Sequence, residues 1–90
     1  MRKHFDVTVT GTVQGVFFRA STHSKAREIG VFGFVRNEVN GNVYIEVEGQ
    51  EDDLKKFLEW CAVGPPHARV TRIEVNEGAL KNFRTFEISR

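Results

Sequence analysis

The chain has 90 residues, of which 40% are hydrophobic and 28% are charged, and its formal net charge is +1. This composition is typical of one globular domain covering residues 1–90, and it excludes a disordered chain. A net charge near zero provides no long-range field for nucleic acid or for an anionic membrane. Any anion-binding site must therefore be local.

Cys61 is the only cysteine, which excludes an intramolecular disulfide bond and a metal cluster built from cysteines. The basic residues at the N-terminus precede no apolar run, so no signal peptide is expected. No stretch approaches the length of a membrane span. We expect a cytoplasmic monomer with neither a membrane nor a nucleic acid as partner.

The first element is a strand, because Phe5, Val7 and Val9 alternate with polar residues. We expect Gly11 to end this strand and residues 11–18 to form a loop. A helix is expected from about Arg19 to residue 29, with a glycine at position 30 as its stop.

Two further strands are predicted over residues 31–39 and 43–47. Between them, Asn40-Gly41 is a strong hairpin signal, because both residues tolerate positive φ. The second helix is the clearest prediction, since its apolar residues repeat with the spacing of one helix face: Leu54, Phe57, Leu58 and Cys61.

Gly64-Pro65-Pro66 ends this helix, and strands are expected over about residues 70–76 and 83–89. The order is therefore β-α-β-β-α-β with a short extra C-terminal strand. This order predicts an α+β, ferredoxin-like sandwich, in which an antiparallel sheet carries both helices on one face. Because that fold serves many functions, it does not select one.

Residues 11–19 carry the chemistry that the sequence suggests. They run from a strand end through a loop to a helix start, where successive N–H groups and the helix dipole favour an anion. Gly15 allows a turn with positive φ, and the Arg19 guanidinium matches two phosphate oxygens. The segment is thus a candidate oxyanion site. The alternative from these residues alone is a simple turn followed by a solvated arginine.

Two common phosphate-binding loops are excluded. No glycine in the chain is followed by lysine, as a nucleotide-binding P-loop requires. A cysteine-dependent phosphatase would need a thiol at position 13, which is Val13. The single thiol, Cys61, lies on the apolar face of the second helix, where core packing is the favoured interpretation.

Two segments together resemble the sequence signatures of the acylphosphatase family. The first is Gly11-Thr12-Val13-Gln14-Gly15-Val16-Phe17-Phe18-Arg19. The second is Gly33-Phe34-Val35-Arg36-Asn37, followed by Gly41-Asn42-Val43 and Gly49. The likeness is unbroken across residues 11–49, and this family has the ferredoxin-like fold.

The resemblance implies a hydrolase that cleaves the carboxyl–phosphate bond of small acyl phosphates and releases inorganic phosphate, without a metal or an organic cofactor. Arg19 matches the phosphate-binding arginine, and Asn37 matches the asparagine that positions the attacking water. The loop residues that match the family's backbone phosphate site are Gln14, Gly15, Val16, Phe17, Phe18 and Arg19.

Other interpretations remain open. The histidines at positions 4, 23 and 67 share no metal-ligand spacing, and we expect them on the surface or on helix faces. Phe32-Gly33-Phe34-Val35 partly matches an RNA-binding strand motif, which makes an RNA-binding module one alternative. A non-catalytic anion-binding domain with the same loop is another.

Overall fold

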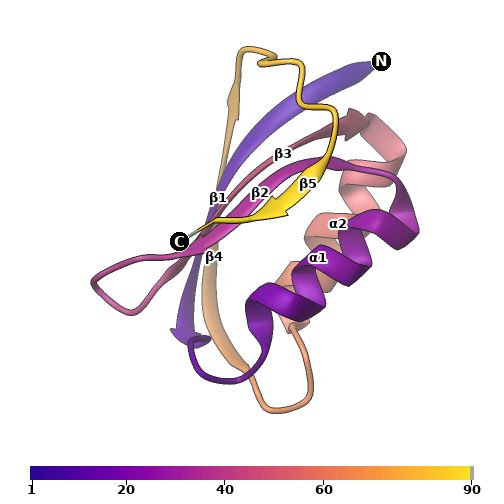
Figure 1. Cartoon of the computed structure of the whole chain (residues 1–90). Helices are drawn as coiled ribbons and strands as arrows, with labels where there is room; N and C mark the ends of the chain where they lie inside the picture. The colour runs from indigo at the N-terminus through magenta and orange to yellow at the C-terminus, as the bar shows by residue number, and fades with distance from the viewer. Residues whose placement is uncertain (90) are drawn as a thin grey trace.

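The structure is a computed structural model that describes residues 1–89, and it has a twisted five-stranded sheet with both helices on one face (Figure 1). The elements in chain order are β1 (Arg2–Thr12), α1 (Phe18–Ile29), β2 (Phe32–Asn37), β3 (Val43–Gln50), α2 (Glu51–Val63), β4 (Arg69–Gly78) and β5 (Phe86–Ile88). The predicted element order and the ferredoxin-like α+β fold are confirmed.

The strand order in the sheet is β4-β1-β3-β2-β5. The first four strands pair antiparallel, as expected, whereas the short β5 pairs parallel with β2 and makes that edge of the sheet mixed. The chain reaches this edge because residues 79–85 pass from β4 across the face of the sheet that carries no helix (Figure 1). Pairing begins only at Phe86, three residues later than the sequence suggested.

The prediction that Gly11 ends the first strand is wrong. β1 continues to Thr12, with an irregularity in its pairing with β4 between Thr10 and Gly11. Gly11 has φ of 137°, and a Cβ atom there would collide with the carbonyl oxygen of Arg69. The glycine therefore permits a close approach of two strands instead of stopping one.

The core lies between the sheet and the helices. Alternate residues of the central strands point into it and are fully buried, including Val7 and Val9 of β1 and Ile45 and Val47 of β3. The helices contribute the buried residues Phe18, Thr22, Ala26, Leu54, Phe57 and Cys61. Cys61 is fully buried within the core cluster, which confirms the expected packing, and this burial raises the pKa of its thiol.

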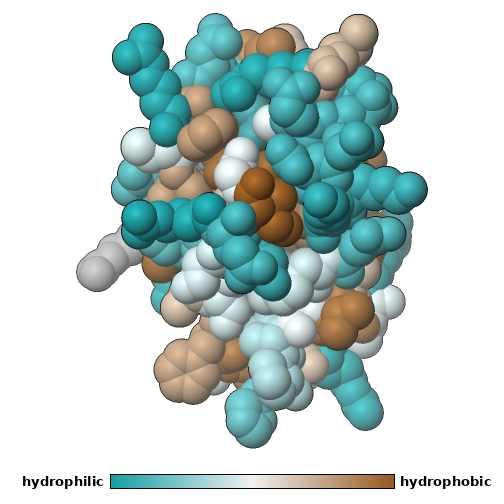
Figure 2. Space-filling model, turned by 90° about the vertical axis from the view of Figure 1, so that its right-hand side faces the viewer, coloured by the Kyte–Doolittle hydropathy of each residue, from teal (hydrophilic) through white to brown (hydrophobic). Residues whose placement is uncertain are grey.

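The outer surface of the helical layer is mostly hydrophilic. Figure 2 shows the side of the molecule on which the helices lie, and the hydrophobic residues that reach this surface are separated from one another. Most apolar side chains are thus directed toward the sheet. None of the helices among residues 1–89 is long and apolar enough to cross a membrane.

The hairpin between β2 and β3 is longer than the two-residue turn predicted at Asn40-Gly41. β2 ends at Asn37, and the loop is closed by a hydrogen bond from the N–H of Glu38 to the carbonyl of Asn42. A second bond runs from the N–H of Gly41 to the carbonyl of Glu38. Because the loop begins at residue 38, Asn37 is the last residue of β2.

The face of the sheet without helices carries a polar cluster, which we define as His4, Asp6, Glu46 and Glu48. His4, expected on the surface, is only 1% exposed. The segment 79–85 covers this part of the sheet, with the Phe83 ring 5.9 Å from the His4 ring. The prediction that His4 lies on the surface is therefore wrong, because the sequence pattern did not reveal that residues 79–85 cover this part of the sheet.

Candidate functional site

The loop between β1 and α1, residues 13–17, twice enters the left-handed region of backbone conformation. Gly15 has φ of 74°, which confirms the expected positive value. Phe17, the residue that precedes α1, has φ of 64° although it is not glycine. Such a conformation costs about 1–2 kcal/mol for an L-residue, and the Phe17 ring, 77% exposed, recovers little by burial. The fold therefore maintains a strained loop.

The strained loop leaves a series of backbone donors free. Among the described residues, no N–H group from Gln14 to Ala20 donates a hydrogen bond to another backbone carbonyl, and the first such bond comes from Ser21. The first turn of α1 contains no acidic residue, so nothing there neutralises the positive end of the helix dipole. These donors make the loop suitable for an oxyanion.

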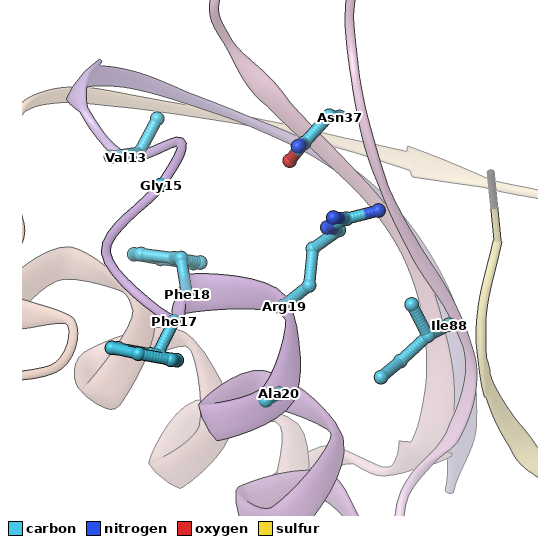
Figure 3. Close-up of a pocket in the computed structure, with 8 residues that line it drawn as sticks. All are labelled: Val13, Gly15, Phe17, Phe18, Arg19, Ala20, Asn37 and Ile88. Carbon is cyan, nitrogen blue, oxygen red and sulfur yellow. The ribbon is translucent and has the colours of Figure 1, made fainter.

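A pocket of about 750 Å³ opens at this loop. Figure 3 shows that the loop, the start of α1, the end of β2 and strand β5 surround it. Its lining residues are Val13, Gly15, Phe17, Phe18, Arg19, Ala20, Asn37 and Ile88.

Arg19 and Asn37 enter this pocket from different elements. Arg19 extends from the first turn of α1 toward the side of the pocket where the Asn37 amide lies (Figure 3). Within residues 1–89 the Arg19 guanidinium forms no ion pair that would compete for an anion. The Asn37 Oδ1 atom is buried and has no hydrogen-bond partner in the described part of the chain. The two side chains most important to the family resemblance are thus brought together and left unpaired.

Gln14 has a function that its position in the loop did not reveal. Its side-chain Nε2 donates to the carbonyl of Glu38 at 2.7 Å and to the carbonyl of Asn42 at 2.9 Å. These carbonyls belong to the β2–β3 hairpin, immediately after Asn37. Gln14 therefore fixes the loop 13–17 relative to the strand that carries Asn37.

The structure places the predicted loop residues in different environments. Gly15, Phe17 and Phe18 line the pocket, whereas Gln14 is bound to the hairpin and Val16 packs against the core. Three lining residues were not predicted: Val13, Ala20 and Ile88. Ile88 could not be found from spacing, because it reaches the pocket only through the pairing of β5 with β2.

The pocket contains few charged groups. Arg19 is the one charged side chain among the described residues that line it, and no carboxylate, histidine or thiol joins it there. The arrangement can concentrate positive potential on an anion and orient a neutral molecule, but it offers no side chain for proton transfer near neutral pH.

The ferredoxin-like domain thus presents free loop N–H groups and an unpaired arginine at one pocket, an arrangement suited to an oxyanion. The family model described as acylphosphatase matches residues 5–88, and the chain belongs to the acylphosphatase family. It is 44% identical to the acylphosphatase of Acaryochloris marina over 91% of this chain and 88% of that protein.

Solved structures agree with this assignment. The acylphosphatase of Bacillus subtilis superposes with a TM-score of 0.95 at 35% identity, covering 100% of both chains. Full-length HypF in a phosphate- and nucleotide-bound form superposes with a TM-score of 0.89 at 29% identity, and the match covers 12% of that longer chain.

The contacts of Gln14 lead to a first prediction. Gln14→Ala removes two hydrogen bonds and frees the loop, although each carbonyl keeps a backbone donor, so we expect about 1–3 kcal/mol of stability to be lost. Displacement of the loop should also lower kcat/KM for an acyl phosphate by roughly 100-fold. Denaturant unfolding and phosphate release from benzoyl phosphate measure the two effects.

Gln50→Ala is the matched control, because the exposed Gln50 side chain contacts only the N-terminal amine. We expect that variant to stay within about 0.5 kcal/mol of the parent protein. A Gln14→Ala protein that is less stable but fully active would show that the site does not need this connection.

Proposed function

We propose that this protein is an acylphosphatase that hydrolyses the carboxyl–phosphate bond of small acyl phosphates, releasing a carboxylate and inorganic phosphate. The observation that carries the proposal is the pocket in which free loop N–H groups, Arg19 and Asn37 face one space without an acid or a base. Membership in the acylphosphatase family supports the same reaction.

The absence of a proton donor suits this substrate class. An acyl phosphate is a mixed anhydride, and its leaving group is a carboxylate whose conjugate acid has a pKa of about 4. Such a group departs as an anion near neutral pH, so no general acid is required. Catalysis then needs only charge stabilisation at the phosphoryl oxygens and an oriented water.

Arg19 and the backbone N–H groups of the loop are assigned to the phosphoryl group. The guanidinium supplies a permanent charge and a planar pair of donors for two phosphate oxygens. The loop and the start of α1 supply further donors that are fixed before the substrate arrives. Because these donors do not reorganise during the reaction, they can stabilise charge that spreads over the phosphoryl oxygens in the transition state.

Asn37 is assigned to the water. Its Oδ1 atom is a buried acceptor without a partner, and such an atom gains free energy when a donor reaches it. After a rotation of the amide that exposes Oδ1 to the pocket, a water enclosed with the substrate can donate to this atom and present its lone pair to phosphorus. The new bond joins the water oxygen to phosphorus, and the bond to the acyl oxygen breaks with its electron pair on the carboxylate. The water proton passes to a phosphoryl oxygen.

The alternatives receive less support. An RNA-binding sheet would need its aromatic residues open to bases, but the Phe34 ring packs edge-on against Phe83 with 6.0 Å between ring centroids. A non-catalytic domain would not need the unpartnered Asn37 acceptor. Cytoplasmic location and a monomeric state remain part of the proposal.

Substitution of Arg19 tests the assigned anchor. Arg19→Ala should lower turnover of benzoyl phosphate below about a tenth of the parent rate, a loss above roughly 1.4 kcal/mol, and should weaken inhibition by inorganic phosphate. Arg19→Lys should recover little, because an ammonium group cannot reproduce the planar pair of donors. Arg27→Ala, an exposed substitution in the last turn of the same helix, is the control. Activity above a tenth in Arg19→Ala would exclude this arginine as the anchor.

Substitution of Asn37 separates orientation of water from binding of phosphate. Asn37→Ala should reduce kcat by roughly 10²–10⁴-fold while KM and inhibition by phosphate stay nearly constant. Asn76→Ala, at an exposed asparagine of β4, is the control and should leave both parameters unchanged. If Asn37→Ala instead raises KM as strongly as it lowers kcat, the residue belongs to the phosphate site and another group must place the water.

A further inference from the structure

The polar cluster on the helix-free face of the sheet has no part in the proposed hydrolysis. It lies toward the start of β1, whereas the loop 13–17 follows the end of that strand. The antiparallel pairing of β1 with β3 brings the cluster together, because its register places His4 opposite Glu48 and Asp6 opposite Glu46. A buried imidazole thus meets three carboxylates on one surface of the sheet.

Glu48 fixes the orientation of the His4 ring. The Glu48 side chain is fully buried, and its Oε2 atom lies 2.7 Å from His4 Nδ1. Both oxygens of this side chain accept hydrogen bonds from backbone N–H groups, Oε2 from Lys81 and Oε1 from Phe83. The carboxylate is therefore an acceptor, and His4 Nδ1 must carry a hydrogen and donate.

His4 Nε2 then points at further acceptors. It lies 2.8 Å from Asp6 Oδ1 and 3.6 Å from Glu46 Oε1, and all three atoms lie within 4.8 Å of one another. A neutral imidazole whose Nδ1 carries the hydrogen has a lone pair on Nε2. Mutual repulsion of these acceptors is reduced by a nearby cation. The Lys81 ammonium group lies beside Glu46 Oε1, and a metal ion between the three atoms would serve all of them.

We propose that His4 Nε2, Asp6 Oδ1 and Glu46 Oε1 form a binding site for a divalent transition-metal ion of the zinc class. One imidazole nitrogen and two carboxylate oxygens suit zinc, whereas calcium and magnesium prefer oxygen ligands alone. Ligand atoms about 2.1 Å from a tetrahedral ion are about 3.4 Å apart. The 3.6 Å between His4 Nε2 and Glu46 Oε1 is close to this value, whereas Asp6 Oδ1, now at hydrogen-bond distance from Nε2, would have to move outward by a few tenths of an ångström. Solvent can supply the fourth ligand, because the Asp6 side chain is 41% exposed.

The residues around these ligands favour the same interpretation. A carboxylate that accepts from the second ring nitrogen, as Glu48 does, is the usual support of a zinc-bound histidine. Glu46 is also held in place, since the Tyr44 hydroxyl donates to its Oε2 atom at 2.8 Å. The Lys81 ammonium group lies 2.7 Å from Glu46 Oε1 and would have to move, which its 56% exposed side chain allows.

The proposed ion would stabilise the fold and take no part in hydrolysis. It would join β1 to β3 and, through Glu48, support the hydrogen bonds that hold residues 81 and 83 over the sheet. Binding to the native state alone raises the melting temperature as the metal concentration rises.

Zinc titration of the chelator-treated full chain tests this site without measuring hydrolysis. Calorimetry should show one ion per chain, zinc should raise the melting temperature, and cobalt(II) should give the visible absorption of a tetrahedral site. Asp6→Asn should lower zinc affinity by at least about tenfold, and Glu48→Gln by roughly 10–100-fold. His67→Gln, at an exposed histidine, is the control and should bind like the parent protein.

His4→Gln removes the nitrogen ligand, and its circular dichroism spectrum shows whether the variant is folded. Should it fail to fold, the partly exposed Asp6→Asn variant still tests the site. Absence of saturable binding, binding unchanged in Asp6→Asn, or binding lost in His67→Gln would each overturn the proposal. The cluster would then be held by its hydrogen bonds and the Lys81–Glu46 ion pair alone.

Discussion

The two hydrogen bonds from the Gln14 side chain connect the loop 13–17 to the β2–β3 hairpin, and the rest of the site depends on this connection. The loop N–H groups and Asn37 come from segments that are not adjacent in the sequence. Neither is useful alone, because a phosphoryl group must be held where a water can approach phosphorus in line. Strand pairing brings β2 beside β3 and β3 beside β1, and the Gln14 amide then ties the loop to the end of β2. This amide adds a second donor to two carbonyls that already accept the backbone bonds closing the hairpin loop.

The site combines a rigid backbone with few reactive side chains. Hydrolysis of an acyl phosphate does not require more, because the carboxylate leaving group departs without a proton donor. In the proposed mechanism, unpaired N–H groups stabilise much of the phosphoryl charge, and backbone groups are not removed by changing one side chain. The residues Gly15 and Phe17 turn the loop with positive φ beside the pocket, and the buried Phe18 side chain joins the start of α1 to the hydrophobic core. Stability of the core and strain in the loop are therefore linked, since a loosely packed helix start could not maintain a left-handed Phe17.

Sequence patterns predicted those elements whose residues lie close together in the sequence. The alternation in β1 and the spacing of Leu54, Phe57 and Cys61 gave a strand and a helix directly. The signature motifs predicted that Arg19 and Asn37 belong to one site, and the pocket contains both. Features that depend on distant pairing were missed. Ile88 reaches the pocket only because residues 79–85 cross the sheet, and the same crossing buries His4 among carboxylates of another strand.

The central claim is that the site holds the phosphoryl group, so that water attacks phosphorus and not the acyl carbon. Hydrolysis of benzoyl phosphate in water enriched in oxygen-18 tests it directly, because the two attacks place the label in different products. Mass spectrometry of both products after a single turnover should find the label in inorganic phosphate and none above background in benzoate. Label in benzoate would mean that water adds to the carbonyl. In that case Arg19 and the loop would hold a leaving group, and Asn37 would require a different role.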